Sequence, residues 1–283
     1  MMARMPTISR RAMLGLGCRA GLVTAAGATA VSALTRAVAV GAPPAPAAPT
    51  YAAGSFASAA RGGAATNWII ARPPGQSAPL RPVILLHGKD SSAATVMSMG
   101  AEQFLADAVA AGLPPFALAA VDGGNGYWHR RASGDDSGAM VLDEFLPLLA
   151  GQGLDTSRVG FLGWSMGGYG ALLLGARLGA GRTAAICAVS PALWTSPGAA
   201  APGAFDGPAD YEANSLWGLR GLADIPVRID IGNDDPFASA TRQFIGQLPT
   251  PPAGGFSPGG HNAEFWSSQL RSELTWMAPL LTA

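Results

Sequence analysis

The residues best suited to chemistry lie in Gly163-Trp164-Ser165-Met166-Gly167, directly after the apolar run Val159–Leu162. An apolar strand, Gly-x-Ser-x-Gly and a helix of small residues are typical of a nucleophile elbow, a strained turn that exposes the serine hydroxyl beside a base. The two flanking glycines have no Cβ atom to clash in so tight a turn. The sequence therefore predicts Ser165 as a nucleophile. It also predicts that the amide of Met166, at the helix N-terminus, faces a developing oxyanion.

The base follows from the order of residues along the chain. The chain has three histidines, and in this arrangement an acid and then a histidine follow the serine. His261 is the only histidine after Ser165, and it lies in a Gly-rich loop, Pro258–Asn262, just before the amphipathic segment Phe265–Leu281. A histidine on a loop before the last helix can reach back over the sheet edge, so His261 is the predicted base.

The acid is expected at the end of a strand between these two residues. The segment Val227–Gly232 alternates apolar and polar residues, and Asn233-Asp234-Asp235-Pro236-Phe237 follows it. Carboxylates at the carboxyl end of such a strand lie at the same edge of the sheet as the elbow. Asp234 and Asp235 both meet this condition, and spacing does not choose between them. Asp230 lies within the strand and is expected to be structural.

A second oxyanion donor is expected from an earlier turn. The apolar strand Pro82–His87 leads into Gly88-Lys89, and the amide of Lys89 is the preferred donor, with Gly88 next to it. His87 precedes the serine and is expected to shape this loop. Three dispersed histidines and two distant cysteines give no metal-ligand spacing, so the sequence predicts neither a metal nor another cofactor.

Two segments carry a family resemblance. Gly163–Leu172 resembles the elbow of the esterase D group of α/β-hydrolases, which includes the S-formylglutathione hydrolases. Gly260–Trp266 resembles the histidine segment of the secreted mycobacterial mycolyltransferases, the antigen 85 complex, in the same superfamily. The resemblance covers the chain from about Tyr51 to the C-terminus as a fold, whereas close motif matches occupy only short windows.

The resemblance also implies residue roles. It implies Ser165 as nucleophile, His261 as base, and the amides of Lys89 and Met166 as the oxyanion hole. In the formylglutathione hydrolases the acid is the aspartate just before a residue and then Phe, a place that Asp235 matches here. The mycolyltransferases have Glu as the acid and Trp two residues after the histidine. This chain has Asp235 and Ala263 at those places, which weakens the case for mycolyl transfer but not for ester hydrolysis.

The N-terminal segment predicts export. Ser9–Leu14 matches a twin-arginine motif, a region rich in small apolar residues follows to about Leu34, and Ala37-Val38-Ala39 suits a signal peptidase. We therefore expect a twin-arginine signal peptide at residues 1–42, a Pro/Ala-rich linker at 43–50 and an α/β-hydrolase domain at 51–283. A retained N-terminal anchor is the alternative, because the segment is nearly long enough to span a membrane.

Charge and cysteine content restrict the partners. Cleavage would remove five of the 18 basic residues and none of the 18 acidic ones, leaving a net charge of −5. Nucleic-acid binding requires a basic face, so it is not expected. Cys187 would remain as a lone thiol in an apolar strand, without a disulfide. The expected partner is a small-molecule or lipid ester, with association to the cell envelope. No motif indicates the oligomeric state.

The remaining pattern alternates short apolar strands with helices. This is typical of the α/β class, here an α/β-hydrolase fold with a mainly parallel, doubly wound sheet flanked by helices. The expected strands are Asn67–Arg72, Pro82–His87, Phe116–Val121, Arg158–Leu162, Ala184–Val189 and Val227–Ile231; the expected helices are Ala93–Ala111, Met140–Ala150, Met166–Leu178, Ala238–Gln247 and the C-terminal segment Phe265–Leu281. The Pro/Gly-rich stretch Pro191–Leu219 is expected to form a small irregular cap.

The loop Asp122–Arg131 follows a strand and is expected at the catalytic edge. Tyr127 and Trp128 are candidates for an acyl or alcohol pocket, and Arg130 for contact with a polar head group. Alternatively, Arg130 and Arg131 pair with Asp135 and Asp136 and fix the loop. Trp164, Trp194 and Phe237 are expected either to form pocket walls or to pack at the rim. Glu144 is expected on a solvated helix face.

The sequence thus predicts an exported serine carboxylesterase that works through an acyl-enzyme. Two alternatives remain. In an acyltransferase, a sugar or lipid alcohol would replace water in the second half-reaction. In a non-catalytic envelope binding protein, a hydrolase scaffold would have lost turnover.

Overall fold

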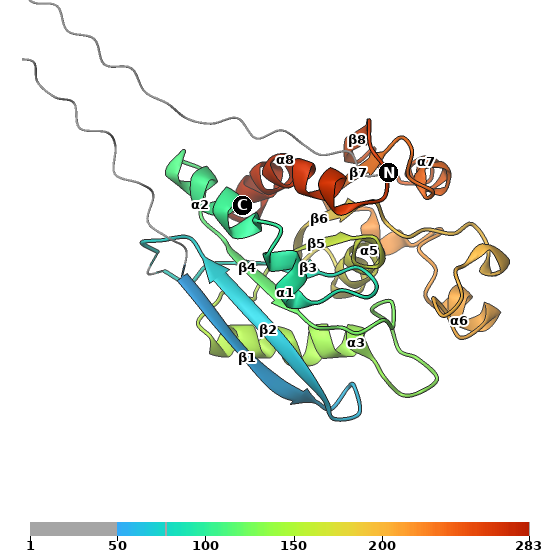
Figure 1. Cartoon of the computed structure of the whole chain (residues 1–283), viewed down its shortest axis with the longest axis horizontal. Coiled ribbons are helices and arrows are strands. Elements are labelled where there is room, and N and C mark those ends of the chain that lie inside the picture. The colour runs from blue at the N-terminus through green and yellow to red at the C-terminus, as the bar shows by residue number, and fades with distance from the viewer. Residues whose placement is uncertain (1–49, 77, 283) are drawn as a thin grey trace, which may run out of the picture. The chain divides into compact units, whose positions relative to one another are not determined.

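One eight-stranded sheet runs through the part of the chain that the computed structural model describes, residues 50–76 and 78–282 (Figure 1). Its strand order is β1-β2-β4-β3-β5-β6-β7-β8. The hairpin β1–β2 is antiparallel and joins β4 in antiparallel fashion, whereas all neighbours from β4 to β8 are parallel. The predicted signal peptide and nearly all of the predicted linker lie outside the described residues.

The strands are β1 (Thr50–Ser58), β2 (Ala64–Arg72), β3 (Pro82–Leu86), β4 (Ala117–Val121), β5 (Val159–Trp164), β6 (Thr183–Val189), β7 (Val227–Gly232) and β8 (Ala253–Ser257). The α-helices are α1 (Ala93–Met97), α2 (Ala101–Ala110), α3 (Ser137–Ala139), α4 (Leu146–Gly151), α5 (Met166–Leu178), α6 (Pro208–Ala213), α7 (Ala238–Ile245) and α8 (Ala263–Thr282). A π-helical segment, Met140–Phe145, joins α3 to α4, and 3-10 turns occur at Pro197–Ala199 and Arg220–Leu222.

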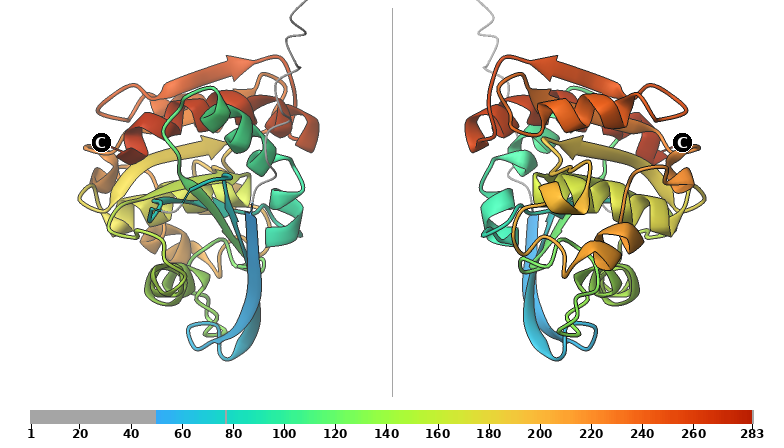
Figure 2. Two further views of the ribbon diagram at one scale, coloured as in Figure 1. Left: turned by 90° about the vertical axis from the view of Figure 1, so that its left-hand side faces the viewer. Right: turned by 90° about the vertical axis from the view of Figure 1, so that its right-hand side faces the viewer.

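Helices cover both faces of the sheet, as Figure 2 shows from two sides. The helix α5 and the continuous segment from α3 to α4 pack on one face, and α1, α2 and α8 pack on the other. Every residue of β3, β4, β5 and β6 is buried. Strands covered on both sides read as continuous apolar runs, and this made them visible in the sequence.

The predicted α/β class and mainly parallel sheet are confirmed, with differences at particular elements. The expected helix Ala93–Ala111 is split into α1 and α2. Gly100, just before α2, has a φ of 87°, a left-handed backbone conformation that a continuous right-handed helix cannot contain. The edge strands β1 and β8 were not predicted. Among the described residues, no helix is both long enough and apolar enough to cross a membrane.

Candidate active site

Ser165 lies at the sharp turn between β5 and α5. Its φ of 57° and ψ of −117° are strained for a residue with a side chain, as expected for an elbow. A Cβ atom on Gly163 would lie 2.3 Å from the carbonyl oxygen of Gly167, and one on Gly167 would lie 1.9 Å from that of Leu86. The flanking positions therefore admit only glycine, because the turn packs directly against the end of β3.

A chain of hydrogen bonds joins the three predicted triad residues. The Ser165 hydroxyl oxygen lies 2.8 Å from His261 Nε2, and His261 Nδ1 lies 2.8 Å from Asp235 Oδ2. The Phe237 amide donates to the other oxygen of Asp235 at 2.9 Å. A carboxylate accepts, so Nδ1 is the donor toward Asp235 and Nε2 is left to accept the serine proton. This is the tautomer that a general base needs.

The structure distinguishes the two candidate acids. Asp235 is 4% exposed and bonded to the imidazole, whereas the neighbouring Asp234 side chain is exposed. The amides of Asn233 and Asp234 donate to the carbonyls of Ser257 and Gly259, at 2.8 and 3.0 Å. These bonds hold the aspartate loop against the loop that carries the histidine. The unpredicted strand β8 is therefore what brings the histidine loop beside the end of β7.

The turn after β3 lies beside the nucleophile. A Cβ atom on Gly88 would be 3.7 Å from the Ser165 Cβ, so the backbone leading into Lys89 passes close to the serine. The next residue, Asp90, is held by Asn125 through two bonds, amide to side chain at 2.8 Å and side chain to side chain at 2.7 Å. On the other side, Met166 is the first residue of α5, where the N–H has no acceptor within the helix.

The ring of His87 holds this turn in place through two hydrogen bonds. The Gly123 amide donates to His87 Nε2 at 2.9 Å, so Nδ1 carries the proton and donates to the Gly88 carbonyl at 2.7 Å. The ring is fully buried and meets Trp128 edge-on at 5.1 Å between centroids. Burial lowers the pKa of His87, which keeps the imidazole neutral as both bonds require. The structure thus places His87 in the loop-shaping position that the sequence indicated.

A cavity of about 360 Å³ opens directly over the serine and the imidazole. Trp164, which precedes the nucleophile, and Trp266, from the first turns of α8, form apolar walls. The Trp266 ring also meets the His261 ring edge-on at 5.1 Å between centroids. The Phe237 ring meets the same His261 ring edge-on at 5.2 Å. The lining is completed by the turn after β3, by α1 and its flanks, and by the first residue of α8, through Gly88, Lys89, Ser91, Thr95, Val96, Ser98, Met99 and Ala263.

Three of the four predicted substrate contacts lie elsewhere, and only Trp164 lines this cavity. Trp128 is fully buried, because the small residues Gly123 and Gly170 leave room for its ring in the core. Tyr127 is 5% exposed and packs against Tyr169 and other rings. Arg130 lines a separate open groove together with acidic residues near α6. The expectation of a pocket built from this loop is therefore wrong for the cavity over Ser165.

The alternative expectation for the same loop also needs correction. The Arg131 side chain pairs with Asp206 at 2.7 Å. The loop pairs with the predicted aspartates only through its backbone, by the Arg131 amide to the Asp135 carbonyl at 2.8 Å and by a β-bridge between Arg130 and Asp136. Asp135 pairs with Arg61 at 3.0 Å, and Asp136 accepts from the Ala139 amide at the start of α3. These partners are distant in sequence, apart from the helix cap, so local spacing did not reveal them.

Glu144 was expected on a solvated face, and that expectation is wrong as well. Its carboxylate accepts from the Ser58 hydroxyl and from the Ala60 amide, the latter at 2.9 Å. The side chain thereby attaches the π-helical segment to the β1–β2 hairpin. Its partners precede it by more than 80 residues, and no helical periodicity shows such a contact.

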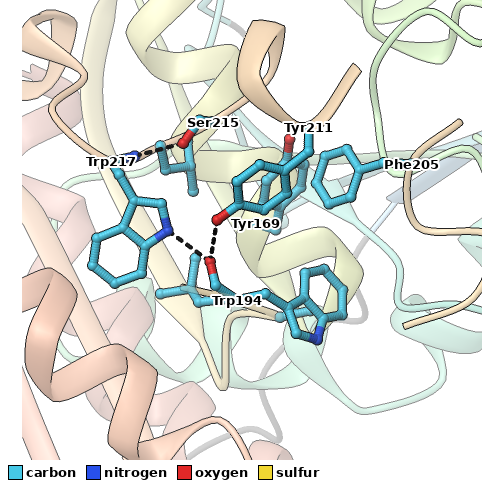
Figure 3. Close-up of a pocket in the computed structure, with 9 residues that line it drawn as sticks. Tyr169, Trp194, Phe205, Tyr211, Ser215 and Trp217 are labelled. Carbon is cyan, nitrogen blue, oxygen red and sulfur yellow. Dashed lines mark hydrogen bonds between the residues drawn. The ribbon is translucent and has the colours of Figure 1, made fainter. Parts of the chain in front are cut away.

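The Pro191–Leu219 segment folds over an aromatic cluster. Figure 3 shows the Trp194 carbonyl oxygen accepting from both the Tyr211 hydroxyl and the Trp217 indole, the latter at 2.7 Å. The ring of Phe205 packs against Tyr211, Trp194 and Tyr169. These rings enclose only about 10 Å³ of free space. Trp194 is accordingly rim packing, and the cluster stabilises the cap without offering room for a ligand.

Sequence reasoning missed the residues that α1 and α8 contribute to the cavity. Thr95 lies on α1, Met99 just after it and Trp266 on α8. In the sequence they are ordinary surface or core residues of helical segments. The one available signal was position. The helix α1 begins just after the Lys89 turn, and Trp266 follows His261 by five residues.

Comparison with known proteins gives structural matches only. No protein-family model and no curated relative matches this chain. A ferulic acid esterase superposes with a TM-score of 0.70 at 19% identity, over 82% of this chain and 98% of that one. An S-formylglutathione hydrolase from Agrobacterium tumefaciens gives 0.69 at 19%, over 82% and 96%.

A third match is a ferulic acid esterase from Anaeromyces mucronatus, determined in complex with ferulic acid. It gives a TM-score of 0.65 at 17% identity, over 82% of this chain and 92% of that one. At these identities the likeness shows the fold, and the predicted α/β-hydrolase fold is thereby confirmed.

Proposed function

We propose that this protein is a serine hydrolase that cleaves carboxylic esters. The observation that carries the proposal is the chain of two 2.8 Å hydrogen bonds from Ser165 through His261 to Asp235, at the base of an open cavity. A non-catalytic scaffold has no need of a strained serine, an imidazole in the base tautomer and a buried carboxylate in one line. The names of the matched structures agree with this chemistry, since each is an ester or thioester hydrolase.

In the proposed mechanism the Ser165 hydroxyl attacks the ester carbonyl carbon while His261 Nε2 takes its proton. The tetrahedral oxyanion is held by the amides of Lys89 and Met166. The imidazolium, stabilised by Asp235, then protonates the leaving alcohol, and the acyl group remains on the serine oxygen. Water, activated by His261, attacks this acyl-enzyme and releases the carboxylic acid.

The cavity indicates the substrates to try. Its volume of about 360 Å³ and its two indole walls suit an acyl group of moderate length or a single aromatic ring. Esters of hydroxycinnamic acids and formyl thioesters, the substrates that the neighbours' names point to, therefore belong in the panel beside p-nitrophenyl esters of increasing chain length.

The experiment compares the purified chain with Ser165→Ala and traps the acyl-enzyme site with a fluorophosphonate probe. We expect ester turnover in the parent protein, a loss of about 10⁶-fold in kcat for the variant, and a probe adduct on the Ser165 peptide alone. Turnover unchanged in the variant, or no adduct on Ser165, would refute the assignment. Adding an alcohol acceptor and analysing the acyl products tests the acyl-transfer alternative in the same samples.

We further propose that residues 1–42 direct export by the twin-arginine route, a proposal that rests on the sequence motif alone. Fused to a reporter that is active only after twin-arginine export, this segment should restore activity, and changing Arg10 and Arg11 to lysine should abolish it. Export that survives both changes would rule the route out. The N-terminal mass of the exported chain would distinguish cleavage near Ala39 from a retained anchor.

A further inference from the structure

Three chemically reactive side chains converge in the core on the α8 side of the sheet, and none of them lines the cavity over the serine. They are Cys187 on β6, Asp230 on β7 and Glu273 on α8. All three are buried, and one ligand atom from each lies within 4.8 Å of the others. No part of the proposed ester chemistry uses them.

Glu273 is the feature that needs a partner. Its side chain is fully buried, and neither carboxylate oxygen has a hydrogen-bond partner among the described residues. An unpaired buried carboxylate is costly unless it is protonated or binds a cation. Cys187, the only cysteine in the described part of the chain, faces the same space as a free thiol.

The charge balance of the cluster fits a divalent cation. When ionised, the thiolate and the two carboxylates carry a charge of −3. Arg228 adds one positive charge, because its guanidinium bonds both oxygens of Asp230, with Nη2 to Oδ1 at 3.0 Å. The remainder is −2. Without a cation, neutrality requires two protons within the cluster. Burial raises the pKa of all three acidic groups, and at Asp230 the bonded Arg228 guanidinium opposes that rise.

We propose that Cys187, Asp230 and Glu273 supply three ligands for one divalent transition-metal ion. Zn²⁺ is the ion that best matches one thiolate and two carboxylates. Metal bonds of about 2.0–2.3 Å require the ligand atoms to close in by roughly 1 Å. Arg228 holds Asp230 from outside the coordination sphere, as a carboxylate ligand's outer partner commonly does.

Binding has a defined proton balance. Asp230 is already paired with Arg228, whereas the Cys187 thiol and the Glu273 carboxyl each give up a proton as the metal bond forms. Entry of one ion therefore releases about two protons per chain. Three elements must close around the ion, so it stabilises the packing of α8 against β6 and β7. Local spacing could not predict this site, because its ligands come from three distant segments.

The test uses the full chain, stripped with a chelator and then refolded with Zn²⁺ or Co²⁺. We expect one tightly bound ion per chain, about two protons released, a rise in Tm, and a thiolate-to-metal charge-transfer band with Co²⁺. Cys187→Ala should abolish the band. Glu273→Gln should weaken binding by about 100-fold or more, since loss of even an outer partner costs about 10- to 100-fold.

Glu264→Gln is the matched control, because this carboxylate lies exposed on the same helix. It should bind metal as the parent chain does, and all three variants should retain the folded far-ultraviolet spectrum. Sub-stoichiometric metal in the parent protein would overturn the proposal. Equal affinity in Glu273→Gln, or a Co²⁺ spectrum that Cys187→Ala leaves unchanged, would do so as well, and would leave a neutral, protonated cluster as the account of these residues.

Discussion

Asp235 and Asp234 are adjacent in sequence but face different environments, and this difference separates the proposed catalytic acid from a carboxylate with no expected role in the reaction. The peptide turn directs Asp235 inward, where it accepts from the Phe237 amide and from the His261 ring. Asp234 remains exposed, and it meets the histidine loop only through its backbone amide. The pair therefore supplies its own control for the role of the acid.

We expect Asp235→Asn to lower kcat by about 10⁴-fold, because an amide cannot hold His261 in the tautomer that accepts the serine proton. Asp234→Asn should leave kcat within about twofold, and neither change should alter the far-ultraviolet spectrum. The measurement is kcat of the parent protein and of both variants by steady-state kinetics on one p-nitrophenyl ester. A larger loss in Asp234→Asn than in Asp235→Asn would reverse the assignment.

We propose that His87 affects the proposed ester hydrolysis through the backbone, because its ring bonds the Gly88 carbonyl and the Gly123 amide. We expect His87→Phe to lower kcat by about 10- to 100-fold with little change in KM. The ring nitrogens that fix Gly88 and Gly123 would be lost, and the Lys89 amide would be held less firmly; removing an oxyanion donor outright costs about 10²–10³.

A second buried histidine serves as the control for this change. The His129 ring contacts the Ala204 carbonyl at 3.3 Å and does not line the cavity over Ser165. His129→Phe should reduce the Tm without reducing kcat in the folded fraction. If both variants lost activity in proportion to their stability, the positioning role of His87 would be refuted.

At the scale of elements, the turn from β5 into α5 is held by the strand beside it. The Gly163 pairing with Leu86 in β3 brings the elbow against that strand's last carbonyl groups. The same contact places the Lys89 turn next to Ser165. The two proposed oxyanion donors, the amides of Lys89 and Met166, are thus positioned by one pair of parallel strands.

We expect Gly167→Ala to prevent folding or to destabilise the protein severely, because the new Cβ would overlap the Leu86 carbonyl oxygen at 1.9 Å. Neither group can move, since both belong to the backbone of packed elements. Gly151→Ala is the matched substitution. Gly151 is the last residue of α4 and is exposed, and a Cβ atom added there would contact no neighbouring group within 4 Å.

Thermal unfolding of the two glycine variants tests this difference. Gly151→Ala should raise stability slightly, in line with the advantage of about 0.5–1 kcal/mol that alanine has over glycine in a helix. A Gly167→Ala protein with the parent Tm would show that the turn is looser than its packing indicates.

The helices and strands that could be predicted are those whose apolar and turn residues form a recognisable pattern within one short segment. The helix α5 begins and ends at the expected residues, because small residues and an apolar run follow a recognisable turn. The edge strand β8 escaped prediction, since its Gly-rich stretch Ala253–Ser257 has little strand propensity and forms by pairing with β7. The order of residues along the chain predicted Ser165, His261 and an aspartate after β7 as triad candidates, and the structure joins them by hydrogen bonds. The cavity could not be predicted, because its walls come from α1 and α8.

At the scale of the whole molecule, the core contains ionisable groups that folding must accommodate. Glu273 faces Cys187 on β6 and the Asp230–Arg228 pair on β7, and all of these lie on the α8 side of the sheet. In the chelator-treated, metal-free chain the burial of Glu273 raises its pKa well above the ordinary value. The folded state therefore retains a proton that the unfolded state has lost.

The sign of the resulting pH dependence follows from proton counting. Above the unfolded-state pKa of Glu, about 4.3, the folded chain binds one more proton than the unfolded chain, so the free energy of unfolding falls as pH rises toward the folded pKa. One proton corresponds to a slope of about 1.4 kcal/mol per pH unit.

Glu273→Gln removes this proton, so the metal-free variant should be more stable than the parent above about pH 5, by a margin that widens toward neutral pH. Urea unfolding in chelator at pH 5, 6 and 7 measures the margin, with Glu264→Gln as the exposed control that should track the parent chain. A margin that stayed constant or narrowed with pH would mean that Glu273 is ionised in the fold and compensated by its neighbours alone.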